Sequence, residues 1–359
     1  MRIHRSLLVW LCLATAASLN AQAPAIQNAD LEIRSVSSGV KATIETLAGQ
    51  STDAVWIAYS VPMIPGDRTM CCFHGDGDSG CCKGCHLEES RGDSQGTRHS
   101  QAVQLEPSRS LLVLVRAESG RLDKLRAYSS DCPLDAGGRR VYWLNGVDAR
   151  QSVDYLAELV RASDWSEKQE KRIANGALAA IAHHDGPAAA AALAGFLAPG
   201  RPRELRKQSA FWLGNARGAA GLQALRKAVR SDNDERFRED AMFAFNVSRE
   251  EESVDELIHF ARNDSSSRVR KQALFWLAQK AGKKAMVTLT VAVERDPDTD
   301  VKKQAVFALS QLPKDEGVVL LIQVARTNNN RTVRKQAMFW LGQSNDPRAL
   351  AFFEEVLTR

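Results

Sequence analysis

Residues 269–277 read VRKQALFWL, and close variants of this segment occur four more times in the chain of 359 residues. The other copies are LRKQSAFWL at 205–213, FREDAMFAF at 237–245, VKKQAVFAL at 301–309 and VRKQAMFWL at 333–341. Each copy begins 32 residues after the one before it, without insertion. A period of about 20–50 residues is typical of stacked repeat proteins. The second half of the chain is therefore predicted to be an array of similar units.

Each unit is predicted to contain two antiparallel helices. The first, fifth and ninth residues of a copy, such as Val269, Ala273 and Leu277, lie on one face of a helix. A second apolar segment follows the same period, with leucines at Leu225, Leu257, Leu289 and Leu321. Polar residues that suit a turn or a helix cap recur between the two segments at Asp232, Asp264, Asp296 and Asn328.

An Asp-containing turn followed by Val-Arg-x-x-Ala-x-x-x-Leu resembles the HEAT-repeat family, in the short bacterial form called PBS-lyase HEAT-like. The resemblance covers residues 167–359, with a degenerate copy ending at Ala182 and a closing helix over 348–358. It implies an armadillo-type α-solenoid. It also implies that the arginine at the second position of each copy pairs with a turn aspartate of a neighbouring repeat, as a structural ladder.

The resemblance does not select an activity, because the family includes scaffolds, chromophore lyases and metal enzymes. The HEAT-like hydroxylases hold iron on His-Glu pairs, whereas His183, His184 and His259 are not followed by glutamate here. The chain also shows no Ser-His-Asp set, phosphate-binding loop or paired carboxylates at catalytic spacing. We therefore expect a non-enzymatic interaction scaffold without a cofactor.

Two positions of the repeat depart from the usual family pattern. The seventh residue is Phe in every copy, and the eighth alternates between Trp and Ala. The alternation predicts interdigitated packing of stacked helices, or else an aromatic ridge on the inner face that receives a protein partner. For the second interpretation, the candidate partner-binding residues are Gln208, Trp212, Gln272, Trp276, Gln304, Gln336 and Trp340.

The N-terminus is predicted to be a secretory signal peptide, residues 1–23. A short basic segment precedes the apolar run Leu7 to Ala17 and the A-x-A signal at Ala21 to Ala23. We expect a periplasmic or secreted bacterial protein with no transmembrane segment in the mature chain. Its removal would leave 46 basic and 43 acidic side chains, a net charge of +3. This near-neutral balance argues against a nucleic-acid partner.

Between the signal and the array, the sequence predicts an α+β organisation. Residues 24–38 are expected to be a flexible lead-in, and residues 39–148 a small β-sandwich or sheet domain. The expected strands lie at 40–47, 54–61, 111–115 and 140–144. A linking helix is predicted within 149–166. A capping box formed by Ser166 and Gln169 is predicted to open the next helix, at 167–182.

Residues 70–88 of this domain, MCCFHGDGDSGCCKGCHLE, are rich in cysteine. Because export implies an oxidising compartment, disulfides are the first interpretation. The candidates are Cys71, Cys72, Cys81, Cys82, Cys85 and Cys132.

Three alternatives for the same cysteines remain open. Cys82, Cys85 and His86 match the C-x-x-C-H motif that attaches c-type haem, which would make the protein a periplasmic electron carrier. The Cys82-x-x-Cys85 spacing also suits zinc, or a redox-active pair.

Overall fold

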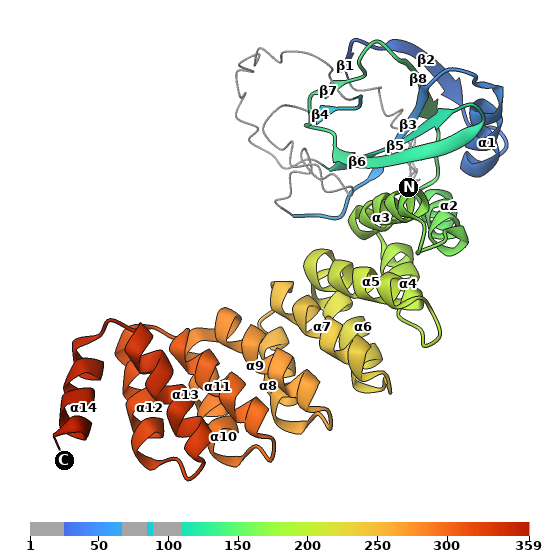
Figure 1. Ribbon diagram of the computed structural model, residues 1–359. Coiled ribbons are helices and arrows are strands. Elements are labelled where there is room, and N and C mark those ends of the chain that lie inside the picture. Colours follow the sequence, from blue (N-terminus) through green and yellow to red (C-terminus); the bar gives the residue numbers. More distant parts are fainter. Residues whose placement is uncertain (1–24, 67–84, 89–108, 359) are drawn as a thin grey trace, which may run out of the picture.

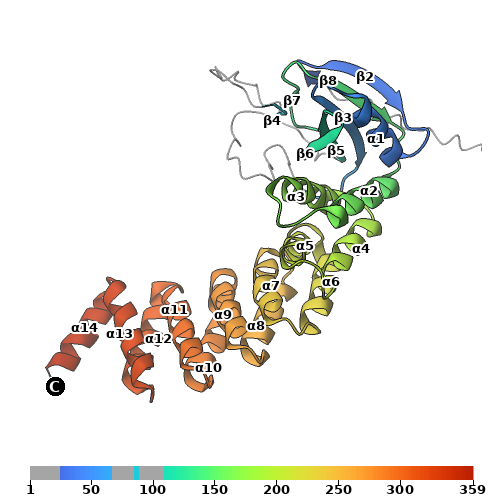
Figure 2. The ribbon, with the colours of Figure 1, turned by 45° about the vertical axis from the view of Figure 1, so that its right-hand side comes forward.

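The computed structural model describes residues 25–66, 85–88 and 109–358. A sheet lies at the N-terminal end, and paired helices follow it along a curved array to the C-terminus (Figure 1). The curvature is also visible after a 45° turn (Figure 2). The predicted combination of an N-terminal sheet region and a C-terminal α-solenoid is confirmed.

The main sheet has five strands in the order β2-β8-β3-β5-β6. They are β2 (Asp30–Ser35), β8 (Arg140–Asn145), β3 (Val55–Pro62), β5 (Ser110–Glu118) and β6 (Arg121–Ser129). The sheet is mixed, since β8 runs parallel to both β2 and β3 while β5 is antiparallel to β3 and β6. A second, small sheet joins β1 (Ile26–Gln27), β7 (Leu134–Asp135) and β4 (Cys85–His86).

Two sequence predictions in this region were wrong. The expected strand at 40–47 is helix α1 (Val40–Gln50), because Val40, Ile44 and Ala48 are spaced by four and all three are buried. The apparent alternation of apolar and polar residues is equally compatible with this helical spacing. The expected lead-in at 24–38 contains β1 and β2 rather than a loose segment.

The two faces of the main sheet belong to different cores. Ile57 and Val113 point to the face covered by helices, and their core continues without a break through the repeats to Phe352. Trp56 and Trp143 belong to a separate core that includes Leu134 of the small sheet and Leu87, which directly follows β4. The sheet is thus the first layer of the solenoid rather than a detached module.

Close backbone packing joins the sheet to helix α3 (Lys168–His183), which follows the linking helix α2 (Ala149–Ala162). A Cβ on Gly176 would lie 2.5 Å from the carbonyl oxygen of Leu125 in β6, so only glycine allows this approach. The backbone N–H of Ile64 also donates to the carbonyl of His183, at 2.9 Å.

The predicted capping box at the start of α3 does not form. The hydroxyl of Ser166 donates to Asp164, and the side-chain amide of Gln169 donates to the carbonyl of Asp123 in β6. Both groups are taken by other partners, which a sequence pattern for an isolated helix does not include.

Each 32-residue unit is a pair of helices, as predicted. The first helices are α4 (Pro187–Phe196), α6 (Gly218–Arg230), α8 (Glu252–Asn263), α10 (Met286–Arg295) and α12 (Lys314–Thr327). The second helices, which carry the repeated segment, are α5 (Arg203–Ala216), α7 (Glu235–Val247), α9 (Ser267–Ala281), α11 (Thr299–Ser310) and α13 (Arg331–Gln343). A 3₁₀ turn, Gly282–Ala285, precedes α10, and α14 (Pro347–Leu357) closes the array. Val269, Ala273 and Leu277 are fully buried, which confirms the packed face.

Candidate functional site

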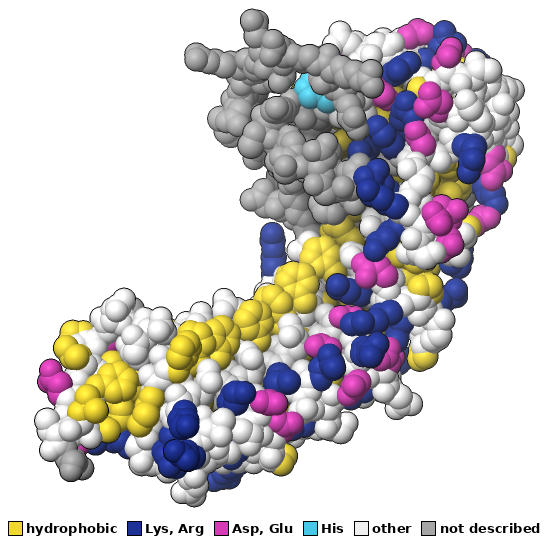
Figure 3. All heavy atoms as spheres, in the orientation of Figure 1, with side chains coloured by type: hydrophobic (Ala, Val, Ile, Leu, Met, Phe, Trp, Pro, Cys, Tyr) yellow, Lys and Arg dark blue, Asp and Glu magenta, His cyan; other side chains and the backbone are white. Residues whose placement is uncertain are grey.

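The seventh and eighth residues of the repeated segment form one continuous series of ring contacts across the second helices. We call this series the aromatic ridge. Its members are Phe211, Trp212, Phe243, Phe275, Trp276, Phe307, Phe339 and Trp340. Figure 3 shows a continuous hydrophobic stripe along the inner edge of the curved array.

The alternation of Trp and Ala produces two kinds of junction along the ridge. Phe211 stacks directly on Phe243, with ring centroids 5.9 Å apart and planes 12° apart. At the next junction Trp276 contacts both Phe243, at 5.0 Å, and Phe275, at 4.7 Å. The same order repeats 64 residues later: Phe275 stacks on Phe307, and Trp340 contacts Phe307 and Phe339. The 64-residue period is therefore a packing pattern of rings.

Burial separates the roles of the two rows. Trp212 is 4% exposed, and Trp276 and Trp340 are half-buried. The indole nitrogens of Trp276 and Trp340 are buried and have no hydrogen-bond acceptor among the described residues. Phe243 and Phe339 are 37% and 55% exposed. Trp212 therefore supports the ridge from below and Phe243 and Phe339 form its most exposed part, while Phe211, Phe275 and Phe307 are half-buried like Trp276 and Trp340.

The predicted glutamines lie beside the ridge. Gln272 and Gln304 line a shallow hollow of about 660 Å³ together with Phe275 and Phe307. Gln208 donates to Glu204 of its own helix, at 3.0 Å, and Gln336 is half-buried on α13. The phenylalanines were not among the predicted site residues, although their invariance at the seventh position was a signal for them.

Charged side chains also enter this hollow. Its lining includes Lys271 and Arg268 of α9 and Glu235 and Glu239 of α7. Glu239 forms an ion pair with Arg268, at 3.4 Å, and Glu235 accepts a hydrogen bond from Ser266. Lys271 forms no ion pair with any carboxylate in the described part of the chain. The hollow thus presents apolar ring edges, neutral amides and charges of both signs, and Lys271 is also within electrostatic reach of Asp298.

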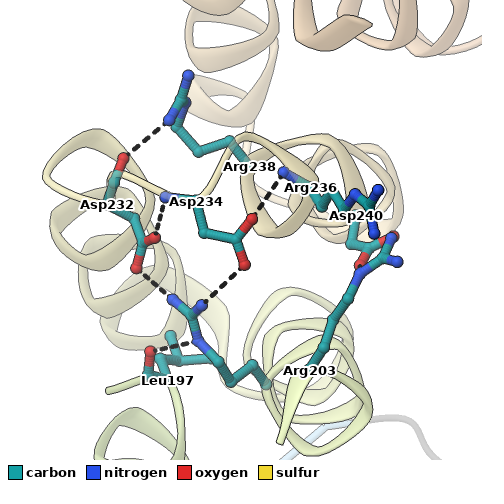
Figure 4. Close-up of polar contacts among 8 residues, drawn as sticks. Leu197, Arg203, Asp232, Asp234, Arg236, Arg238 and Asp240 are labelled. Carbon is teal, nitrogen blue, oxygen red and sulfur yellow. Dashed lines mark hydrogen bonds and ion pairs between the residues drawn. The ribbon is translucent and has the colours of Figure 1, made fainter. Parts of the chain in front are cut away.

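The arginine row is a structural ladder, as the family resemblance implied. Arg238 binds Asp264 through two hydrogen bonds, of 2.8 and 2.9 Å, and Arg270 binds Asp296 in the same way. Arg206 begins the ladder by pairing with Asp232 and by donating to the carbonyl of Leu197. Figure 4 shows that Asp232 also accepts from the backbone of Asp234, and that Arg238 reaches the backbone carbonyl of Asp232. These arginines are fully engaged, so they do not form an anion-binding stripe.

A buried polar chain connects the sheet to the first repeats. The Tyr59 hydroxyl contacts that of Ser152 at 2.7 Å, and Ser152 contacts Nε2 of His184 at 3.1 Å. His184 is fully buried, and burial, followed by the nearby positive charge of Arg217, lowers its pKa to about 4. Because all three side chains are inaccessible to solvent, this chain is a structural connection and not a reaction site.

Of the cysteine candidates, only Cys85 and Cys132 lie within the described residues, and Cys71, Cys72, Cys81 and Cys82 lie outside them. Cys132 is 4% exposed, with its sulfur 3.4 Å from the Ser129 hydroxyl. His86, the haem-ligand candidate, lies in strand β4, with Nδ1 3.8 Å from a carboxylate oxygen of Asp135. Among the described residues, no group of three or more His, Cys, Asp or Glu side chains is placed to hold a metal ion. No helix of the described chain is long and apolar enough to cross a membrane.

Residues 254–337 and 286–359 match the family described as HEAT repeats. Among solved structures, human deoxyhypusine hydroxylase in complex with glycerol is similar at 17% identity, covering 59% of this chain and 80% of that one, with a TM-score of 0.31. Kap121p is similar at 14% identity, covering 53% of this chain and 25% of that one, with a TM-score of 0.35. No curated protein matches the chain.

Proposed function

From the HEAT-repeat identity of residues 254–359, we propose that this protein is an exported, non-enzymatic scaffold whose inner face holds a protein partner. One observation carries the proposal: the aromatic ridge is continuous over five second helices, Phe243 and Phe339 on it are exposed, and a polar hollow lies beside Phe275 and Phe307. If these rings served only to pack the repeats together, we would expect all of them to be buried. Large exposed apolar patches rimmed by polar groups are typical of interaction surfaces.

The chemistry of the ridge favours a polypeptide as the partner. Aromatic rings give a large contact area at a small cost in conformational entropy, and side-chain amides can pair with a peptide backbone. Gln272 and Gln304 line the hollow next to the rings. Together these groups suit an extended segment of a protein laid across the second helices.

We place this scaffold in the periplasm or outside the cell, without a cofactor. The basic and apolar N-terminus, with its A-x-A signal, supports export. The six cysteines outside the predicted signal peptide are an even number, which suits disulfide pairing in an oxidising compartment.

The second candidate function is electron transfer by c-type haem at Cys82, Cys85 and His86. Its position in strand β4, 3.8 Å from the carboxylate of Asp135, gives His86 a protein partner already. We therefore rank this function second. A visible spectrum of the purified native protein separates the two: a Soret band would put electron transfer first, and a colourless protein leaves the scaffold.

The scaffold is tested by replacing the two most exposed ridge residues, in the double variant Phe243→Gln with Phe339→Gln. The matched control is Val287→Gln with Val319→Gln. These valines are 66% and 50% exposed, lie 32 residues apart, and belong to the first helices of their repeats. Each protein is used as bait in an envelope extract of the cells that produce it, and captured proteins are purified and titrated directly.

We expect a partner that binds the wild type and the valine variant with equal affinity and binds the phenylalanine variant about tenfold more weakly. Both variants should keep the wild-type melting temperature within a few degrees, since the replaced rings are partly in solvent. Equal binding by all three proteins would remove the ridge from the function.

A further inference from the structure

The flank of the aromatic ridge carries a row of cations that none of the structural ladders uses. The third residue of the repeated segment is Lys in four copies and Glu in one: Lys207, Glu239, Lys271, Lys303 and Lys335. This residue lies four positions before the phenylalanine, so it is the neighbour of that ring on the same helix face. The hollow confirms this placement for one repeat, because Lys271 and Phe275 line it together.

The row keeps most of its positive charge. Its single acid, Glu239, is paired with Arg268. Lys303 has an exposed ion pair with Asp300 of its own helix, which is worth little in water. Lys207 and Lys271 are within electrostatic reach of Glu204 and Asp298, although neither they nor Lys335 makes a direct ion pair with a carboxylate of the described chain. Figure 3 shows Lys and Arg side chains, with some Asp and Glu among them, below the hydrophobic stripe.

The other flank of the ridge is almost uncharged. The residue four positions after each phenylalanine is Asn215, Val247, Gln279, Gln311 or Gln343. The inner face therefore has a side on which lysines recur beside acids, an aromatic centre and a neutral side. A partner that complements it carries acidic groups along one edge only and apolar groups along its centre.

The rings favour a polypeptide over a single-stranded nucleic acid, which would also be attracted by cations and aromatics. Nucleic-acid bases bind proteins by stacking on open ring faces. Here Phe211 and Phe243 face each other with planes 12° apart, and Phe275 and Phe307 do so with planes 5° apart. One face of each of these rings is taken by the other ring of its pair, which leaves less open face for a base to stack on. Edges suit aliphatic and aromatic side chains.

Spacing sets the length of the partner segment. Packed helices lie about 8–10 Å apart, and an extended chain advances about 3.3 Å per residue. About three residues therefore cross each repeat, and a segment of about twelve residues crosses four repeats.

We propose that the inner face recognises an extended, acidic and apolar polypeptide segment, with its acidic edge on the lysine row. This inference rests on the proposed scaffold function and names the chemistry of its partner. It predicts binding that weakens with salt, since Lys207 and Lys335 are exposed to solvent and Lys271 and Lys303 are partly exposed.

The test is a fluorescence-anisotropy titration of the full-length protein with labelled peptides of four triplets. The probe repeats Leu-Glu-Ser. One control peptide replaces Glu with Lys, and a second replaces Leu with Ser. Oligothymidylate is the nucleic-acid control. The protein variant is Lys271→Glu with Lys303→Glu, and its match is Lys227→Glu with Arg295→Glu, two exposed cations on the first helices α6 and α10.

We expect the Leu-Glu-Ser peptide to bind the wild type and the α6/α10 variant alike, and to bind the Lys271/Lys303 variant about tenfold more weakly. The Lys and Ser control peptides and oligothymidylate should bind at least about tenfold more weakly to the wild type. The proposal is overturned if the Lys peptide, the Ser peptide or oligothymidylate binds the wild type with the same affinity as the Leu-Glu-Ser peptide. It is also overturned if no peptide binds.

These outcomes are independent of the scaffold test. If the Phe243/Phe339 variant loses a native partner while the lysine reversals leave that partner's affinity unchanged, the scaffold stands and the acidic edge is wrong. If ridge and lysine variants both retain the partner, both proposals fail.

Discussion

The protonation of His184 affects the stability of the fold, because its imidazole is buried where a charge is unfavourable. It faces Ser152 at Nε2, while Arg217 bonds the backbone carbonyl of His184 and His183 adjoins it in sequence. Burial and both cationic neighbours lower its pKa, to about 4. Neither the pairing nor the burial could be predicted from His183-His184-Asp185, since the partners come from α2 and from the turn that leads into α6.

The sign of the pH effect follows from this lowered pKa. An unfolded chain binds the proton with a pKa near 6.5, whereas the folded chain binds it only near 4. The free energy of unfolding should therefore decrease as the pH falls from about 6.5 to about 4, by up to about 3 kcal/mol. Urea denaturation at several pH values measures it. In His184→Asn the slope between pH 5 and 6.5 should shrink, in a range where carboxylates contribute little; an unchanged slope would show that His184 does not titrate as described.

Glycines in the second helices decide how closely neighbouring repeats approach. A Cβ on Gly214 of α5 would lie 2.1 Å from the carbonyl oxygen of Ala244 in α7. Gly342 of α13 occupies the same repeat position, and a Cβ there would meet nothing within 4 Å. The sequence shows two glycines at one register position, and only the packing distinguishes them.

This pair makes an internally controlled experiment. Gly214→Ala should destabilise the protein by about 3 kcal/mol, because the backbone of α7 cannot move away without opening the core. Gly342→Ala should be neutral or stabilise by about 0.5–1 kcal/mol, through its higher helix propensity. Thermal and chemical denaturation of both variants check this, and equal effects would contradict the close approach of α5 and α7.

Along the array, the ladder of ion pairs is complete near the sheet and is interrupted toward the C-terminus. Arg238 and Arg270 each hold a turn aspartate with a two-bonded fork. At the next step the pair is Lys302 and Asn328, and Lys302 donates instead to the carbonyl of Glu294. In a repeat protein, stability is roughly a sum of repeat and interface contributions. The C-terminal helices should therefore open first.

Restoring the missing pair should change that order. Lys302→Arg together with Asn328→Asp is expected to stabilise the junction of α10 to α13 by about 1 kcal/mol, since a forked pair in a half-buried site is stronger than a lone amine. Hydrogen exchange of α12 and α13 should slow, while exchange in α5 and α7 stays the same. The single change Lys302→Arg, which lacks the acid, serves as the control and should have little effect.

The 32-residue period was sufficient to predict the helix pairs, the packed face and the turn residues, and the resemblance to HEAT repeats implied the arginine ladder. These features depend on interactions within one repeat or with the next one, and such interactions recur in the sequence at a fixed spacing. The strand predicted at 40–47 and the capping box at Ser166 failed for the opposite reason. Helix α1 is decided by burial against the sheet, and Gln169 is bound by β6.

The aromatic residues at the end of the segment VRKQALFWL were compatible with packing between helices or with a partner-binding ridge. The segment alone could not distinguish these two interpretations. Trp276 and Phe275 are neighbours in the chain, yet Trp276 fills the space between two helices and Phe275 lines an open hollow with Lys271. Which of the two rings lines the hollow depends on the packing against residues 32 positions away. The repeat itself can thus be predicted from local sequence, whereas the surface that it presents is determined by packing between repeats.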